Sequence, residues 1–224
     1  MNETRATSFG LYEASRILMP GFYFTTLLLF FCLAFLPAPL SPDRLGGWIW
    51  PAFLFLTVVS GLTMYAKETP KRRRAFQQNQ PSTFLQTLAR TMPDTEVLSD
   101  AEAQRTYFYI LNNHVPSLFH EKIFFFGTVY QVMIQVRRTT FWFALLGLLV
   151  AGAMLAAGSA LPERSGAVLF VIVTWMIYLI NVRYNKADRK MQENYQDQIF
   201  WLQMNADLVR RILTQERSTR TNPS

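Results

Sequence analysis

The sequence predicts an all-α integral membrane protein with four transmembrane helices, cytoplasmic N and C termini, a helical cytosolic region and a homo-oligomeric assembly. The chain is 50% hydrophobic and only 17% charged, whereas about a quarter of the residues of a soluble domain are charged. A helix needs roughly 20 apolar residues to cross about 30 Å of hydrocarbon. Four windows free of Asp, Glu, Lys and Arg reach or approach that length: Ile17–Pro42, Leu45–Ala66, Thr139–Pro162 and Ser165–Val182.

The distribution of basic residues predicts the orientation of these helices. Of the 22 Lys and Arg residues, 2 lie in the N-terminal tail, 10 between Lys67 and Arg138, and 8 from Arg183 onward. The two short loops carry one each, Arg44 and Arg164. Because cytoplasmic segments of membrane proteins carry an excess of Lys and Arg, both termini and the central segment are expected in the cytoplasm. The expected location is the bacterial inner membrane.

In chain order, these observations divide the sequence into six parts. They are a cytoplasmic tail (1–17), a first transmembrane hairpin (18–66), a basic helical cytosolic or interfacial segment (67–138), a second hairpin (139–182), a cytosolic helix continuing from the fourth transmembrane helix (183–216) and a disordered tail (217–224). The second helix carries Thr57, Ser60, Gly61 and Thr63. These small residues favour close helix packing over the alternative, a wet pore lining.

The third transmembrane helix, expected from Phe141 to Leu161, is rich in small residues at four-residue spacing. Gly147 with Ala151, and Gly152 with Ala156, are such pairs. Small residues let helices approach closely in lipid, where apolar burial drives little association. One smooth face would serve a neighbour in the same chain, and a second face predicts packing between subunits or a bend at Gly152.

The C-terminal region contains no Pro or Gly between Val182 and Glu216, which predicts one helix running on from the membrane. Apolar residues follow a heptad-like spacing of four and three. The members of this seam are Tyr195, Ile199, Leu202, Ala206, Val209 and Leu213. Two interpretations remain open: the seam packs on copies of itself, or it packs against the central segment of its own chain.

The central segment predicts several short helices. Pro81-Ser82 can start one, and Ser99 with Glu102 has the spacing of a capping box, which starts another that runs to about Asn112. A turn is expected from there to Pro116. The stretch from Ile123 to Val136 is free of charge but has too few residues to span a membrane. An amphipathic helix that leads into the third transmembrane helix is expected here.

The basic run Lys71, Arg72, Arg73 and Arg74, together with Arg137 and Arg138, has two interpretations. Basic residues beside a membrane helix set topology and attract anionic lipid headgroups. The same residues could bind a polyanion, with Phe76 and Tyr107 to Tyr109 available for base stacking. These six basic residues are the candidate ligand-binding residues. The candidate pore-lining or packing residues are Gly147, Gly152, Ala156, Thr174, Tyr178 and Asn181.

No enzyme is expected, and no cofactor or metal. His114 and His120 are the only histidines, and their spacing does not match a His-Glu-x-x-His zinc motif. The single cysteine, Cys32, lies inside the first helix. The four charge-free windows contain none of the intramembrane charges usual in coupled transporters. Three functions remain: a homo-oligomeric channel gated from the cytosol, a scaffold that recruits an acidic partner or nucleic acid to the membrane, and a membrane-bound assembly factor.

Four short helices, cytoplasmic termini and one basic cytosolic insertion resemble the small membrane effectors of bacterial anti-phage systems. Among them the chain is most similar to the channel subunit of the Hailong system, and Kiwa-type membrane proteins share the outline. The resemblance implies a homotetrameric channel that is held shut by a nucleotide or single-stranded oligonucleotide. It also implies that a nucleotidyltransferase encoded nearby makes this ligand. Loss of the ligand during infection would then open the channel and depolarise the membrane.

Overall fold

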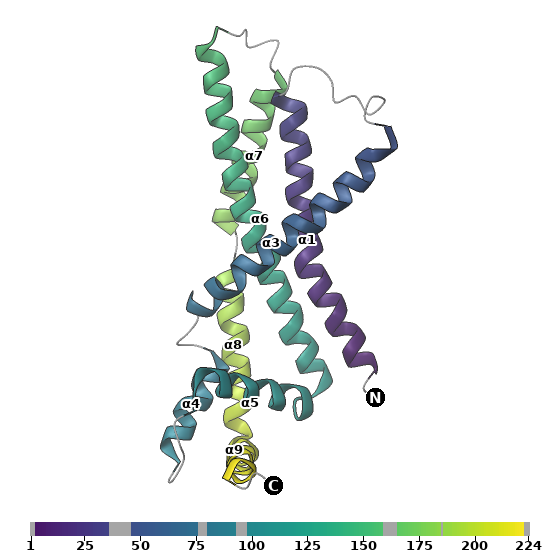
Figure 1. Cartoon of the computed structure of the whole chain (residues 1–224). Helices are drawn as coiled ribbons and strands as arrows, with labels where there is room; N and C mark the ends of the chain where they lie inside the picture. Colours follow the sequence, from purple (N-terminus) through teal and green to yellow (C-terminus); the bar gives the residue numbers. More distant parts are fainter. Residues whose placement is uncertain are drawn as a thin grey trace. The chain divides into compact units, whose positions relative to one another are not determined.

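The computed structural model describes residues 3–35, 46–75, 80–92, 98–158, 165–184 and 186–221. Over these residues the chain is all-α, as predicted (Figure 1). Four stretches are long and apolar enough to cross a membrane: Gly10–Phe35, Ile49–Lys67, Ser117–Ala156 and Ser165–Met204. The all-α class and the four candidate spans are therefore confirmed, and the chain is a multi-pass membrane protein. The cytoplasmic orientation of the termini and the homo-oligomeric assembly stay predictions.

The chain folds into two units, each built from two separate stretches. The spanning unit comprises residues 2–69 and 128–187, and the polar unit comprises residues 70–127 and 188–224. Helices α3 and α6 each begin in one unit and end in the other.

Helix α1 (Glu3–Phe35) begins well before the predicted first span. The first helix was predicted to start at residue 18, and this is wrong because the backbone is helical from Glu3 onward. The cytoplasmic location of residues 1–17 stays a prediction. Pro20 lies inside the helix. A short 3-10 turn (Gly46–Trp48) precedes α3 (Ile49–Ala75), which continues through the basic run Lys71 to Arg74.

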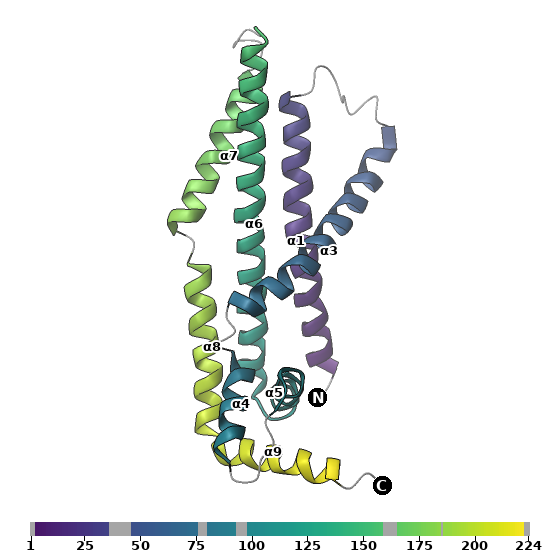
Figure 2. The same cartoon turned by 60° about the vertical axis from the view of Figure 1, so that its left-hand side comes forward.

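Helix α6 (Ser117–Ala156) is one unbroken helix of 40 residues (Figure 2). At 1.5 Å per residue it is about 60 Å long, twice the thickness of the hydrocarbon layer. The predicted amphipathic helix does lead into the third span. The span was predicted to run to Leu161, and this is wrong because α6 ends at Ala156. Gly158 has φ 79°, the left-handed conformation that stops a helix.

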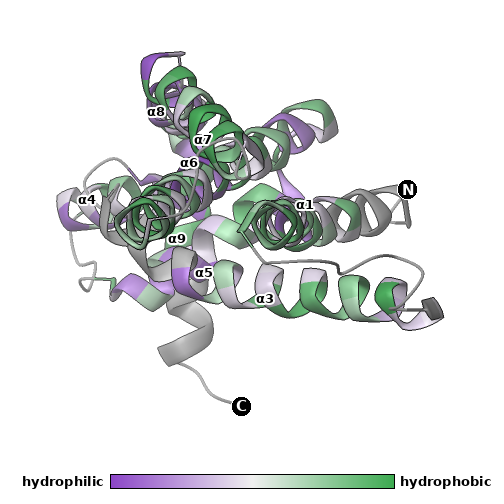
Figure 3. Ribbon diagram, turned by 90° about the horizontal axis from the view of Figure 1, so that it is seen from above, coloured by the Kyte–Doolittle hydropathy of each residue, from purple (hydrophilic) through white to green (hydrophobic). Residues whose placement is uncertain are grey.

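The spanning unit has its core at the C-terminal end of α1. Leu27 and Phe35 of α1, Phe143 of α6, and Ala167 and Phe170 of α7 (Ser165–Tyr184) form this core. The Phe35 and Phe170 rings meet edge to face at 5.7 Å, an arrangement worth about 1 kcal/mol beyond area burial. Most large apolar side chains elsewhere on the spans are exposed, and α7 is hydrophobic over most of its length (Figure 3). The spans therefore offer lipid or other helices an almost continuous apolar surface.

The polar unit contains α4 (Pro81–Thr91), α5 (Asp100–Asn113), α8 (Ala187–Met204) and α9 (Ala206–Thr221). The predicted capping box is confirmed: Glu102 N–H donates to Ser99 Oγ, and Ser99 N–H donates to Glu102 Oε2. Helices α4 and α5 pack as a pair. The core of this unit includes Leu85, Ala89, Ala103, Ile110, Leu111, Leu202 and Val209.

The prediction of one continuous C-terminal helix is wrong. Helix α7 ends at Tyr184, Lys186 is not helical, and Asn205 separates α8 from α9. Asn205 Nδ2 donates to the carbonyl oxygen of Trp201, a local bond that competes with the helix ladder. The predicted disordered tail is also wrong for residues 217–221, which belong to α9. Residues 222–224 lie outside the described residues.

The heptad-like seam packs inside its own chain. Leu202, Val209 and Leu213 are each at most 4% exposed in the single chain. The second of the two interpretations, packing against the central segment, is therefore the one that the fold supports, since α8 and residues 70–127 belong to one unit.

Candidate functional site

A cluster of charged and polar side chains joins α1, α3 and α6 in the spanning unit. Arg16 Nη1 lies 2.6 Å from Glu13 Oε1, and Tyr65 donates its hydroxyl to Glu13 Oε2 at 2.7 Å. Arg16 Nε donates to Thr128 Oγ1 at 3.2 Å. Arg16 is only 8% exposed. The Glu13 carboxylate is thus held from two sides, by a guanidinium on its own helix and a phenol on α3.

Helix α6 contributes a polar face to this cluster. Thr128, Gln131 and Gln135 follow one another at helical spacing, and all three are buried. Gln135 Nε2 donates to the carbonyl oxygen of Met64, one residue before Tyr65. Gln131 Nε2 is buried and, among the described residues, has no hydrogen-bond partner. An unpaired buried amide costs about 1–3 kcal/mol. This polar face therefore contains one donor whose hydrogen bond is missing.

This cluster was not predicted from the sequence, for two reasons. Residues 1–17 were predicted to lie outside the first helix, so no pairing of Glu13 or Arg16 with the spans was expected. The other members lie 52 residues (Tyr65) and 112 residues (Thr128) away in sequence from their partners. The three-residue spacing of Glu13 and Arg16, which suits an ion pair on one helical face, was the available signal.

Next to the cluster, α1 and α3 cross in direct backbone contact (Figure 1). A Cβ on Gly61 would overlap the carbonyl oxygen of Ile17, and a Cβ on Gly21 would overlap that of Thr57. Thr57 Oγ1 donates to Thr25 Oγ1 at 3.3 Å across the same crossing. Of the two roles considered for the small residues of the second helix, Thr57 and Gly61 have the packing role.

The predicted ligand-binding residues fall on two helices. Lys71 to Arg74 lie in the helical backbone at the end of α3, and their side chains are outside the described residues. Arg137 and Arg138 are half-buried on α6 in the spanning unit.

The predicted small-residue positions of α6 lie in two environments. Gly147 is buried, and a Cβ there would lie 3.2 Å from the Phe170 ring of α7. Gly152 and Ala156 are exposed, and no atom lies within 4 Å of a Cβ placed on Gly152. One smooth face therefore packs inside the chain, and the second is uncovered in the single chain.

The predicted polar residues of α7 either form hydrogen bonds within their own helix or pack against an aromatic ring. Thr174 is 1% exposed and donates to the carbonyl oxygen of Phe170 at 2.7 Å. Asn181 Nδ2 donates to the carbonyl oxygen of Ile177 at 2.9 Å. The Tyr178 ring packs against Phe141 with centroids 5.2 Å apart.

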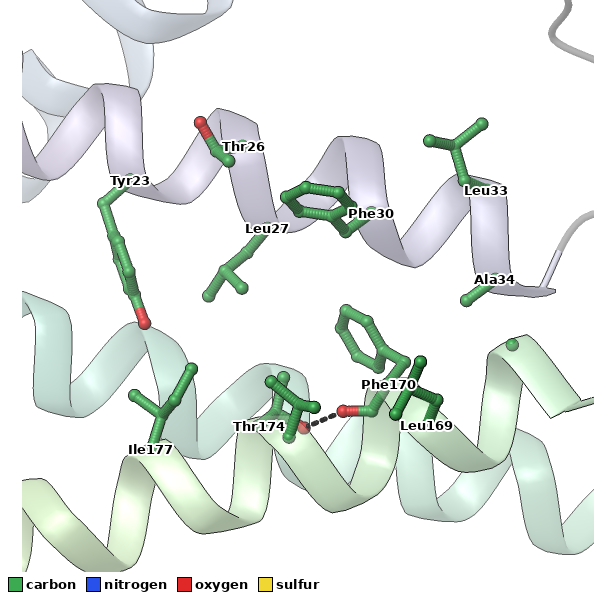
Figure 4. A pocket seen from close by; sticks show the side chains of 12 residues that line it. Tyr23, Thr26, Leu27, Phe30, Leu33, Ala34, Leu169, Phe170, Thr174 and Ile177 are labelled. Atoms are coloured by element: carbon green, nitrogen blue, oxygen red, sulfur yellow. Dashed lines mark hydrogen bonds between the residues drawn. The ribbon is translucent and has the colours of Figure 1, made fainter.

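Helices α1 and α7 enclose an apolar groove of about 490 Å³ (Figure 4). Leu27, Phe30 and Leu33 line it from α1, and Leu169 and Ile177 line it from α7. Its hydroxyl groups are partly satisfied already, because Tyr23 bonds Thr140 and Thr174 bonds its own backbone. The groove is therefore suited to an aliphatic occupant.

The polar unit contains a buried amide pair on α8. Tyr107 of α5 donates its hydroxyl to Gln198 Oε1, and burial, with nearby Tyr195, raises the pKa of Tyr107 so that it stays a neutral donor. Gln198 Nε2 and both polar side-chain atoms of Asn194 have no partner among the described residues. Within these ranges no three His, Cys, Asp or Glu side chains gather as metal ligands.

Comparison with known proteins gives no relative. The sequence matches no protein-family profile, no curated protein and no solved structure.

Proposed function

We propose that the protein is a homo-oligomeric membrane channel effector, gated through its basic region by a nucleotide or single-stranded oligonucleotide, that depolarises the bacterial inner membrane in anti-phage defence. A homotetramer is the proposed assembly. A nucleotidyltransferase encoded nearby would supply the ligand. Membrane lipids would be the other partners of the protein.

The observation that carries this proposal is the second small-residue face of α6. Gly147 already packs against Phe170 of α7, whereas Gly152 and Ala156 are uncovered. Small residues drive helix association in lipid through close van der Waals contact. Among the helices that the structure describes, none of the same chain covers this face, which supports contact with another subunit.

Two further features support gating from the basic region. Helix α3 is continuous from the span to Ala75, so the span and Lys71 to Arg74 share one helix. The Glu13–Arg16 pair lies among polar groups in the N-terminal half of α1, and buried charges in membrane proteins commonly mark ion paths or gates. A polyanion bound to the basic run would act on the helix that contacts this pair.

The second candidate is a membrane-anchored scaffold that recruits an acidic partner or nucleic acid without conducting ions. The polar unit favours it, because that unit has a core of its own that includes Leu85, Ile110 and Leu111. The outward surface of the spans is also largely apolar, as expected for helices that only anchor.

Membrane potential in cells expressing the protein, reported by a voltage-sensitive dye, tests the first candidate against the second. A channel predicts depolarisation that Gly152→Leu abolishes, while Ile172→Leu at an exposed position of α7 leaves it unchanged. Native mass spectrometry of the same variants in nanodiscs should report loss of the oligomer only for Gly152→Leu. A monomeric parent protein would contradict the proposal.

A further inference from the structure

Helix α3 is held to the rest of the spanning unit at two levels. The crossing of Gly21 and Gly61 brings the backbones of α1 and α3 into contact. About one turn later, Tyr65 donates to Glu13 Oε2, and the carbonyl oxygen of Met64 accepts from Gln135 Nε2. The glycine crossing is a van der Waals contact between backbones. The contacts of Met64 and Tyr65 are hydrogen bonds, which can break and re-form.

We infer that Tyr65 and Glu13 form a latch that holds α3, at Met64 and Tyr65, against α1 and α6 within the spanning unit, with the Gly21–Gly61 crossing as its pivot. The consequence for conduction rests on the proposed function. Beyond Tyr65 the helix runs to Ala75 and carries Lys71 to Arg74, so force on that run reaches the latch through the helix backbone.

The charges of the latch allow the contact between Tyr65 and Glu13 to break and re-form. Glu13 is held by Arg16 on its own helix, at 2.6 Å, so its carboxylate keeps an ionic partner when Tyr65 leaves. Arg16 keeps Thr128 as an acceptor as well. Release therefore costs the hydrogen bonds to α3 without leaving an unpaired charge, and a carboxylate left unpaired would be far more costly.

The polar face of α6 supports the same conclusion. Gln131 lies between Thr128 and Gln135 on that face, and its Nε2 has no partner among the described residues. A conformation in which water reached this amide would recover part of the cost of the unpaired donor. The latched conformation thus leaves the Gln131 side-chain amide without a hydrogen bond.

Spin labels on α1 and α3 test the latch directly. Leu11 and Ala66 are exposed and lie beside the latch without belonging to it. Leu11→Cys and Ala66→Cys would be introduced into a Cys32→Ala background, since Cys32 is the sole cysteine. Pulsed electron spin resonance in nanodiscs then measures the distance distribution between the two labels.

Tyr65→Phe removes the hydroxyl alone and should shift the equilibrium about tenfold or more toward longer distances, because a hydrogen bond to a charged group is lost. Tyr12→Phe is the matched control, since Tyr12 has no hydrogen bond to Glu13 and should leave the distribution unchanged. Glu13→Gln keeps an acceptor for Tyr65, so its distribution should lie between those of the parent and Tyr65→Phe. Identical distributions for the parent and Tyr65→Phe, in folded protein, would overturn the latch.

The same nanodisc samples separate failure of the latch from failure of the channel. Dye-reported ion flux is measured on liposomes carrying each variant. Longer label distances without any flux would leave the latch standing and contradict the channel. An unchanged distance contradicts the latch whatever the flux.

Discussion

Gly21 of α1 and Gly61 of α3 bring the backbones of two membrane-spanning helices into direct contact. A Cβ on Gly21 would lie 3.0 Å from the amide nitrogen of Gly61 and would overlap the carbonyl oxygen of Thr57. The atoms that a side chain would meet belong to the backbone and cannot rotate away. Glycine is therefore required on both sides of this crossing, and the contact fixes where α3 leaves α1.

Gly21→Ala should weaken the crossing of α1 and α3. The added methyl group overpacks a site with rigid neighbours, which typically costs about 1–3 kcal/mol. Gly10→Ala on the same helix is the control, because no atom lies within 4 Å of its Cβ. Thermal unfolding in nanodiscs should show a lower midpoint for Gly21→Ala alone. Equal midpoints would contradict the close contact.

The two glycines of α6 should respond differently to a leucine. Gly147→Leu would collide with the ring of Phe170, 3.2 Å from the Cβ position, and should reduce the stability of the single chain. Gly152→Leu places its Cβ where no atom of the described residues lies within 4 Å, and it should change only the oligomeric state. Thermal midpoint and native mass measured on both variants distinguish these effects; destabilisation of the monomer by Gly152→Leu would be inconsistent with an open face.

Loss of Arg16 should cost far more stability than loss of an exposed ionic partner. Arg16→Met leaves the Glu13 carboxylate in a partly buried cluster, where Tyr65 still donates a hydrogen bond to it, and breaking a buried pair costs about 3 kcal/mol or more. Lys122→Met breaks the exposed pair with Asp197 and should cost less than about 1 kcal/mol. Urea titration of the two variants in detergent measures the difference, and equal losses would show that Arg16 is not buried with its partners.

Asn194→Leu should stabilise the polar unit. Two buried atoms of Asn194 have no partner among the described residues, and an unpaired polar group costs about 1–3 kcal/mol. Hydrogen exchange of the α8 amides in the full chain should therefore slow. Faster exchange would contradict this prediction, because it would mean that the Asn194 amide makes a hydrogen bond that stabilises the unit.

Tyr107→Phe should have the opposite effect on the same unit. It removes the hydroxyl that donates to Gln198 Oε1 and leaves that buried oxygen without its donor. A cost of about 1–2 kcal/mol is expected, visible as faster exchange of the α8 amides. Tyr109→Phe, an exposed neighbour on α5, serves as the control and should not change the exchange rates.

The parts of the fold predicted from sequence are those set by local composition. The four spans follow from apolar runs long enough for a bilayer. The start of α5 follows from Ser99 and Glu102, whose reciprocal bonds need only three residues of separation. The two faces of α6 follow from the four-residue spacing of its small residues, although only the structure distinguishes the face that packs on α7.

The parts that were missed depend on contacts distant in sequence or on weak local preferences. The part of α1 from Glu3 to Ser15 has mixed charge, which is typical of a tail outside the membrane. It nevertheless contains Glu13, which accepts a hydrogen bond from Tyr65. The break at Asn205 has no Pro or Gly to mark it and depends on a local amide bond to Trp201. The polar cluster was not predictable, because nothing in a linear pattern pairs Arg16 with Thr128.

Ion flux through the purified protein in liposomes tests the channel proposal most directly. Liposomes with a potassium gradient and a voltage-sensitive dye would carry the parent protein or Gly152→Leu, with and without a single-stranded oligonucleotide. If the protein is a channel, the parent protein conducts ions, the oligonucleotide changes that flux, and Gly152→Leu shows none. A stable dye signal from reconstituted parent oligomers under both conditions would contradict a channel and favour the membrane-anchored scaffold.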